Sequence, residues 1–198
     1  MSGEPHVQRV SGGDIDACLP DLARLRIRVF REYPYLYEGS IAYEEKYLKT
    51  YVAAPDSVMV LVRDGGRVVG ASSGLPLEAE PPSVVEPFLA CGYDPRRIFY
   101  YGESVLLPDY RGRGLGKRFF EEREAHVRER GRFETICFCA VQRPDDHPRR
   151  PADYAPLDAF WNRRGFVRHP ELRTTFSWRD LDEEAESPKP MMFWLKTL

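Results

Sequence analysis

The segment from Ile98 to Arg130 constrains the fold more than any other part of the chain. Its first ten residues, 98–107, are rich in β-branched and aromatic side chains and lie between Arg-Arg and Pro, which predicts a buried strand. A proline turn and a glycine-rich loop follow, and the residues after 112 predict a helix that ends at Gly131. The segment therefore predicts a strand, a loop and a helix in direct succession.

The junction between this loop and its helix predicts an anion-binding site. The first turn of a helix leaves backbone N–H groups unpaired, and the helix dipole makes that end positive. Glycines at positions 112, 114 and 116 let an anion approach the backbone closely. Four cationic side chains surround the same point: Arg111, Arg113, Lys117 and Arg118. A phosphate, above all a pyrophosphate, is the ligand that this junction favours.

The spacing of the glycines separates this loop from two common nucleotide motifs. The third glycine comes one residue too early for G-x-G-x-x-G, and Arg111 and Arg118 break the P-loop pattern. The loop instead matches R-x-x-G-x-G through Arg111, Gly114 and Gly116. With the strand, proline turn and helix around it, the sequence resembles the GNAT superfamily of N-acetyltransferases.

Length and composition are consistent with one enzyme domain over residues 1–198. The net charge of −2 argues against nucleic acid or a membrane surface as a partner. No apolar run is long enough to span a bilayer, and the N-terminus has no signal pattern, so a cytoplasmic protein is expected. Without a C-x-x-C pair no metal site is predicted, and Cys137 and Cys139 are expected to be buried thiols.

Hydrophobic periodicity and turn residues predict alternating strands and helices along the whole chain. The segments 98–107, 112–130 and 133–141 predict a crossover that makes two strands parallel. The turn residues Asp64-Gly65-Gly66 between two apolar runs predict a hairpin. An acidic run, 180–186, is interpreted as a solvated connection. The other expected strands are 7–10, 57–63, 67–74, 172–178 and 191–198, and the other expected helices are 14–32, 40–52, 83–91 and 157–166.

The resemblance implies an α/β (α+β) fold with a mixed, mostly antiparallel sheet of six or seven strands and helices on both faces. A parallel pair would splay apart to admit the pantetheine arm of acetyl-CoA. The thioester and pantetheine would pair with backbone groups of Val105, Leu106 and Leu107. The pyrophosphate would lie on the N–H groups of the loop, with Arg111 nearby; the loop residues are Gly112, Arg113, Gly114, Leu115, Gly116 and Lys117.

Glu103 is the candidate general base for transfer of the acetyl group to a primary amine by direct attack in a ternary complex. It shares a strand face with Val105, and a carboxylate in an apolar strand is costly unless it is paired or useful. Members of the family often use a Glu on this strand to take the amine proton. The alternative is a structural carboxylate bonded to a neighbouring loop.

The general acid is where the chain departs from the family pattern. Trp161 occupies the position of the usual Tyr, and an indole supplies no proton at neutral pH. Tyr154, seven residues earlier, is the candidate that replaces it. His147 is a second candidate because its ordinary pKa, about 6.5, suits proton transfer. Protonation of the thiolate by water is the third alternative.

The acceptor is less well defined than the donor, and a small-molecule or a peptide amine would fit. Aspartates would attract an ammonium group, whereas arginines would recognise a carboxylate. The loop 33–39 either lines the acceptor pocket, as the resemblance implies, or plugs a gap between two helices. The aspartates are Asp145, Asp146, Asp153 and Asp158, and the arginines are Arg143, Arg149 and Arg150.

Two other functions are compatible with the sequence. A non-catalytic acyl-CoA-binding regulatory protein is the main alternative to the enzyme, and the Trp at position 161 favours it. An interaction module that uses the Arg-rich segment 143–150 is the other, and the net charge argues against it. The sequence does not decide between an acetyl and a longer acyl donor, or between a monomer and a homodimer.

Overall fold

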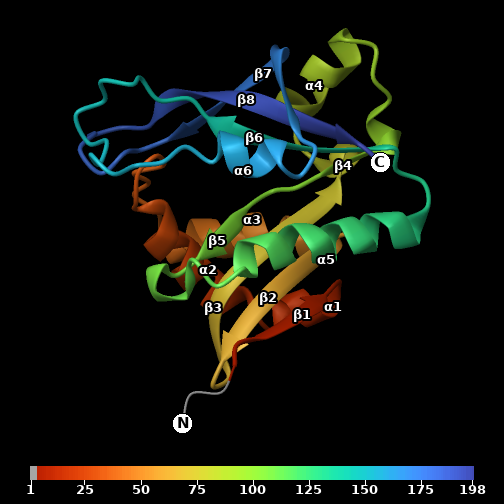
Figure 1. Cartoon of the computed structure of the whole chain (residues 1–198), viewed down its shortest axis with the longest axis horizontal. Helices are drawn as coiled ribbons and strands as arrows, with labels where there is room; N and C mark the ends of the chain where they lie inside the picture. Colours follow the sequence, from red (N-terminus) through yellow and green to blue (C-terminus); the bar gives the residue numbers. More distant parts are fainter. Residues whose placement is uncertain (1–3) are drawn as a thin grey trace.

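A computed structural model describes residues 4–198 as one mixed sheet of eight strands with helices on both faces (Figure 1). The helix α5 crosses one face of β2 and β3, and α2 and α3 lie on the other (Figure 1). The strands are β1 His6–Val10, β2 Val58–Asp64, β3 Arg67–Pro76, β4 Ile98–Tyr100, β5 Ser104–Leu106, β6 Thr135–Val141, β7 Val167–Trp178 and β8 Ser187–Thr197. The helices are α1 Gly13–Asp16, α2 Leu19–Phe30, α3 Ile41–Ala53, α4 Pro82–Ala90, α5 Leu115–Arg130 and α6 Asp158–Asn162.

The strand order is β1-β2-β3-β4-β6-β8-β7, and β5 pairs with β3. Every pair is antiparallel except β4 with β6, which is parallel. The β2–β3 hairpin and the crossover from β4 through α5 to β6 confirm two predictions made from the sequence. The mixed, mostly antiparallel sheet is therefore confirmed, with one strand more than expected.

The extra strand arises because the predicted strand 98–107 is broken, so the prediction of one continuous strand was wrong. β4 follows β6 only as far as Tyr101, whose N–H donates to the Cys137 carbonyl at 2.8 Å. The chain then leaves β6 and continues along β3, with which both β4 and β5 pair. At Gly102 a Cβ atom would overlap the Tyr51 hydroxyl, so only glycine fits at the break. Beyond Cys137, β6 pairs with β8 alone, and the two parallel strands splay apart.

Other boundaries also differ from the expectations. The helix expected over 14–32 is two helices, α1 and α2, and Pro20 lies in the first turn of α2. Ser40 caps α3, since its Oγ accepts from the N–H of Tyr43 at 3.4 Å. The acidic run 180–186 is only partly solvated, because Asp180 is buried at its start. Buried polar groups need partners, and this carboxylate has two cationic ones, described below.

No helix within residues 4–198 is long and apolar enough to cross a membrane. The domain is expected to span residues 1–198. Residues 1–3 lie outside the residues that the structure describes.

Candidate active site

The glycine loop, residues 111–117, folds as an open cradle at the start of α5. Gly112 and Gly114 adopt φ of 76° and 79°, the left-handed region that side chains with a Cβ avoid. A Cβ at either position would meet no atom within 4 Å, so the space above the loop is open. Gly114 is the N-cap of α5 and leaves the first N–H groups of the helix facing that space. The cradle therefore fits a phosphate.

The cationic side chains of the glycine loop stabilise the conformation of the loop as well as giving it positive charge. The Arg111 Nε donates to the Leu106 carbonyl at 3.1 Å, and its Nη1 lies 2.7 Å from the Glu32 carboxylate. Arg113 lies over the ring of Tyr110 at 5.3 Å. Arg111 thus ties the loop to the end of β5 while its charge stays beside the cradle.

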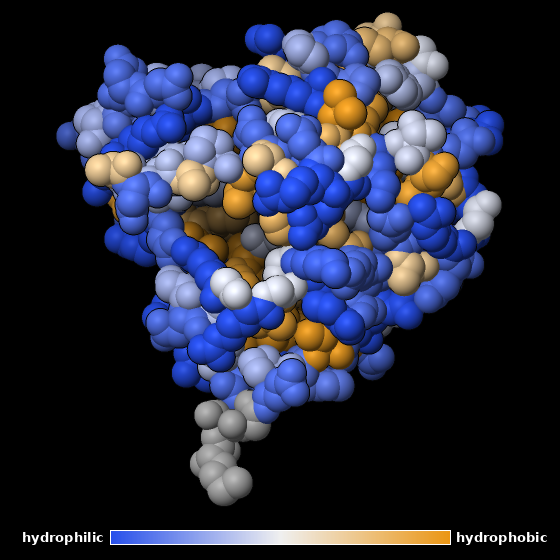
Figure 2. Space-filling model, in the orientation of Figure 1, coloured by the Kyte–Doolittle hydropathy of each residue, from blue (hydrophilic) through white to orange (hydrophobic). Residues whose placement is uncertain are grey.

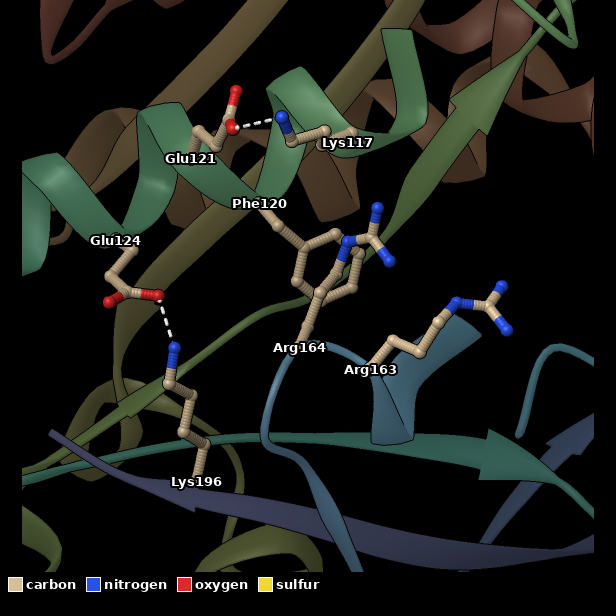
Figure 3. A pocket seen from close by; sticks show the side chains of 7 residues that line it. All are labelled: Lys117, Phe120, Glu121, Glu124, Arg163, Arg164 and Lys196. Carbon is tan, nitrogen blue, oxygen red and sulfur yellow. Dashed lines mark hydrogen bonds and ion pairs between the residues drawn. The ribbon is translucent and has the colours of Figure 1, made fainter. Parts of the chain in front are cut away.

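A cavity of about 450 Å³, here the basic cavity, lies beside the loop between α5, the end of α6 and β8 (Figure 3). Lys117 pairs with Glu121, and Lys196 pairs with Glu124 at 2.6 Å. The Arg164 guanidinium stacks on Phe160 at 3.4 Å, and Arg163 lines the cavity beside it. The residues that line the basic cavity are Lys117, Phe120, Glu121, Glu124, Arg163, Arg164 and Lys196.

Arg163 and Arg164 were not predicted as part of a site. In the sequence they are two basic residues at the end of a short helix, which is a common surface pattern. Only the fold places them opposite α5, so their position in the basic cavity depends on tertiary contacts.

The edge of β5 that faces away from β3 is the open side of the splay. The Leu107 N–H donates to Val69 at 3.0 Å, and the Glu103 carbonyl accepts from Ser73 at 3.0 Å. Because alternate residues of an antiparallel strand point to the same neighbour, Val105 faces β3 too. The backbone groups of Ser104 and Leu106 therefore point to the open edge. Of the three residues predicted to pair with the pantetheine, Leu106 is the one whose backbone groups point there.

The molecular surface is hollowed beside this edge. Figure 2 shows a recess between the α6 region and the β5 region, with hydrophobic residues inside it. A recess of this kind suits a largely apolar ligand arm next to strand backbone groups.

Glu103 lies at the strand break, between β4 and β5, and its side chain is buried. The Arg26 Nη1 is 2.6 Å from its Oε2, and the Tyr47 hydroxyl donates to the same oxygen at 3.4 Å. Arg26 also pairs with Glu44, which is completely buried on α3. The carboxylate predicted as a base is thus both paired and placed at the splay.

The Glu103 backbone is fixed by α5. The Arg123 Nη1 donates to the carbonyls of Ser73 at 3.0 Å and Glu103 at 3.2 Å, and its Nη2 donates to Ser104 Oγ at 2.9 Å. The guanidinium lies over the ring of Tyr101 at 4.0 Å. One buried side chain therefore supplies donors to the chain where β4 and β5 separate.

A second cavity of about 380 Å³, here the aromatic cavity, reaches Glu103 from the side of α2, α3 and β7. Its charged lining residues are Arg26, Glu44, Glu80 and Glu103, and aromatic side chains form much of the wall. These include Phe30, Tyr35, Tyr37, Tyr47, Tyr100 and Trp178. Because Tyr35 and Tyr37 line it, the loop 33–39 contributes to this pocket and also fills the space next to α2.

Glu80 is a site residue that the sequence did not indicate, because it follows an apolar strand within a short connection. Burial and the nearby charge of Glu103 raise the pKa of Glu80 to about 7. Two carboxylates that face one cavity with different environments are a common arrangement for proton transfer and cation binding.

The candidate acids lie outside both cavities. Tyr154 packs edge-on against Tyr33 at 4.7 Å, with Arg150 5.3 Å above its ring, and burial raises its pKa. The His147 ring lies 5.7 Å from Tyr33. Trp161 packs against neighbouring aromatic rings at about 5 Å. Tyr154 and His147 therefore both lie against the Tyr33 ring, and neither lies beside Glu103.

Arg143 does not serve the substrate role considered from the sequence. Its Nη1 lies 2.8 Å from Asp180, and the guanidinium also donates to the carbonyls of Pro34 and Tyr35. Asp180 pairs with Lys189 as well, at 3.3 Å. Arg143 is therefore partly buried and occupied, and it is a structural residue that fixes the loop 33–39.

The cysteines behave as expected for buried thiols on β6. Cys137 and Cys139 are both free and buried, and the Cys139 Sγ is 3.1 Å from the Tyr100 hydroxyl. Burial raises the pKa of Cys139 to about 12, so the thiol stays protonated. Among residues 4–198, no three His, Cys, Asp or Glu side chains are grouped to hold a metal ion.

A mixed sheet with a splayed parallel pair, beside a glycine loop that opens a helix, is the arrangement expected of an acetyl-CoA-dependent acyltransferase. The chain belongs to the acetyltransferase (GNAT) family, whose sequence model matches residues 21–152. The resemblance noted in the sequence is therefore confirmed, and so is the class of enzyme. No curated protein matches the chain in sequence.

Solved structures share the fold over nearly the whole chain. Ribosomal-protein-alanine N-acetyltransferase from Brucella melitensis is 15% identical with a TM-score of 0.63, over 98% of this chain and 99% of that one. The putative acetyltransferase yncA from Salmonella typhimurium, with acetyl-CoA, is 8% identical with a TM-score of 0.62, over 99% and 95%. PaiA N-acetyltransferase from Thermoplasma acidophilum, in complex with coenzyme A, is 12% identical with a TM-score of 0.59, over 99% and 100%.

Proposed function

We propose that this acetyltransferase moves the acetyl group of acetyl-CoA to a primary amine by direct attack in a ternary complex, with Glu103 as the general base. The observation that carries the proposal is a linear arrangement along β5. The glycine loop lies at one end of the strand, the open edge of Leu106 and Ser104 follows, and Glu103 lies at the other end. Phosphate, pantetheine and thioester occur in the same order along a coenzyme A thioester.

The residues present fit the donor. The glycine loop supplies N–H groups to the pyrophosphate, and Gly112 and Gly114 leave room for it. Arg163 and Arg164, in the basic cavity, add charge for the remaining phosphate. Among the residues predicted for the pantetheine, the support is strongest for Leu106, whose backbone lies on the open edge.

The chain's own groups handle the protons of the reaction. Acetyl-CoA supplies the acetyl thioester, in which a C–S bond gives way to a C–N bond. The Glu103 carboxylate takes a proton from the incoming ammonium group, so that the nitrogen lone pair becomes available for attack. Arg26 and Tyr47 orient that carboxylate. After the C–N bond has formed the nitrogen gives up a second proton to water, and Tyr154 or water supplies a proton to the thiolate that leaves.

Calorimetric titration with acetyl-CoA tests the donor site. Gly114→Val places a branched side chain in the cradle and is expected to abolish saturable binding. Gly131→Val is the matched control, because Gly131 caps the other end of α5 with φ of 67° and open space around it. Both variants carry similar backbone strain, about 1 to 2 kcal/mol. Equal binding by wild type and Gly114→Val would refute the assignment of the glycine loop.

Release of the free thiol in the presence of amines tests the reaction itself. Thiol release that depends on an amine supports the transferase. Binding of acetyl-CoA without thiol release from any amine would instead establish the acyl-CoA-binding regulatory protein considered from the sequence.

A further inference from the structure

The charges of the aromatic cavity favour a cationic ligand. Its lining carries three carboxylates, Glu44, Glu80 and Glu103, against the single guanidinium of Arg26. Arg26 lies between Glu44 and Glu103 and pairs with both, so its charge is already used. At slightly alkaline pH the cavity therefore carries excess negative charge that no lining residue balances.

A buried acceptor atom in this cavity also lacks a partner. The side chain of Glu44 is completely buried, and no donor within residues 4–198 makes a hydrogen bond of good geometry to its Oε1. The Tyr37 hydroxyl lies near this carboxylate, and burial and then Glu44 raise the pKa of Tyr37. A buried carboxylate oxygen without a good donor is costly, and a cation in the adjoining cavity would offset that cost through space. This oxygen is an observation independent of the net charge, and it points to the same kind of ligand.

The walls of the cavity are apolar and held in place. Tyr35 packs on Phe30 at 4.6 Å and against Trp178 at 5.9 Å, and its carbonyl accepts from the Trp178 Nε1 at 3.0 Å. Arg143 holds the Tyr35 carbonyl from the other side at 2.8 Å. Fixed aromatic faces bind flat apolar groups and stabilise cations through their π electrons.

We propose that the aromatic cavity is the acceptor site and that it selects a primary amine on an aromatic or apolar body that carries no carboxylate. The proposal rests on the proposed function, because the cavity reaches Glu103 at the splay. Glu80 and Glu44 attract the ammonium group, and the aromatic walls take the body. A carboxylate on the ligand would find no free cation among the lining residues, so amino acids and other zwitterions are disfavoured.

The test uses ligands that separate these features, titrated calorimetrically at pH 8 into the full-length protein, with and without coenzyme A. 2-Phenylethylamine has the ammonium and the ring. Phenylalanine adds a carboxylate to the same body, spermidine has charge without a ring, and trialanine offers a peptide N-terminus. We expect 2-phenylethylamine to bind at least about tenfold more tightly than each of the others.

Two variants locate the binding on the protein. Glu80→Gln removes a charge of the cavity and is expected to weaken binding of 2-phenylethylamine about tenfold. Glu78→Gln is the matched control, because Glu78 is exposed, pairs with Arg132 and does not line the cavity. It should bind as the wild type does.

The outcomes distinguish this inference from the proposed function. Equal or tighter binding of phenylalanine, spermidine or the peptide would overturn the inference, and so would undiminished binding by Glu80→Gln. Absence of 2-phenylethylamine binding with and without coenzyme A would overturn it too. Binding with the expected preference but no thiol release after addition of acetyl-CoA would uphold the amine site and refute the transfer.

Discussion

Glu80→Gln should stabilise the protein at alkaline pH, because the native state holds this carboxyl in an unfavourable place for a charge. Burial and Glu103 raise the pKa of Glu80 from an ordinary 4.5 to about 7. Between pH 4.5 and pH 7, Glu80 keeps its proton in the native state, whereas it has lost that proton in the unfolded chain. Stability from this group is thus complete below pH 4.5 and is lost as the pH rises through 7.

The size of the effect follows from the same two values. One unit of pKa corresponds to about 1.36 kcal/mol, so the full loss is about 3 kcal/mol. Between pH 5 and pH 8 the linkage relation gives about 2.5 kcal/mol. Since Glu80 is only partly buried and solvent screens its charge, we expect about 2 kcal/mol. A neutral glutamine of the same shape does not titrate, so the variant does not lose this stability as the pH rises.

Urea denaturation of both proteins at pH 5 and pH 8 measures the difference. The stability gained by Glu80→Gln should grow by about 2 kcal/mol from the lower to the higher pH. Glu78→Gln, on the exposed side of the same connection, should change by less than about 0.5 kcal/mol. A gain that is independent of pH, or that shrinks as the pH rises, would refute the reasoning. A more stable variant that binds amine less well would also show that lost binding is not lost folding.

Three other substitutions test the remaining parts of the site. Glu103→Gln should lower the rate of thiol release about 100-fold and flatten its pH profile while acetyl-CoA affinity is kept; an unaltered profile would place the base elsewhere. Tyr154→Phe should slow thiol release at saturating substrates, and a wild-type rate would remove Tyr154 as the acid. Arg123→Met should cost at least about 2 kcal/mol in chemical denaturation, because the carbonyls of Ser73 and Glu103 and the Ser104 hydroxyl each lose one hydrogen bond; a smaller loss would mean that water replaces it.

The parts of the site that could be predicted are those that local sequence determines. The glycine loop needs a left-handed backbone at Gly112 and Gly114, and few residues other than glycine allow it. The hairpin and the crossover follow from turn residues and apolar runs. Each of these signals lies within one continuous stretch of the chain, so the sequence displays it directly.

The aromatic cavity could not be predicted because it is assembled from distant segments. Arg26, Glu44, Glu80 and Glu103 come from four separate parts of the chain and meet only through packing. In the sequence each resembles an ordinary charged residue on a helix or in a connection. The strand break escaped prediction for the same reason, since its determinant Arg123 lies about 20 residues from Gly102 on another element.

The position of Arg123 on α5 imposes a length requirement on the helix. Gly114 and Arg123 are nine residues apart in sequence, which corresponds to about 13 Å along a helix axis. Adding or removing one residue between them would rotate the guanidinium by about 100° and turn it away from the carbonyls of Ser73 and Glu103. The spacing between the donor cradle and the strand break is therefore set by the helical repeat, and it tolerates substitutions on the exposed face of α5 but not insertions.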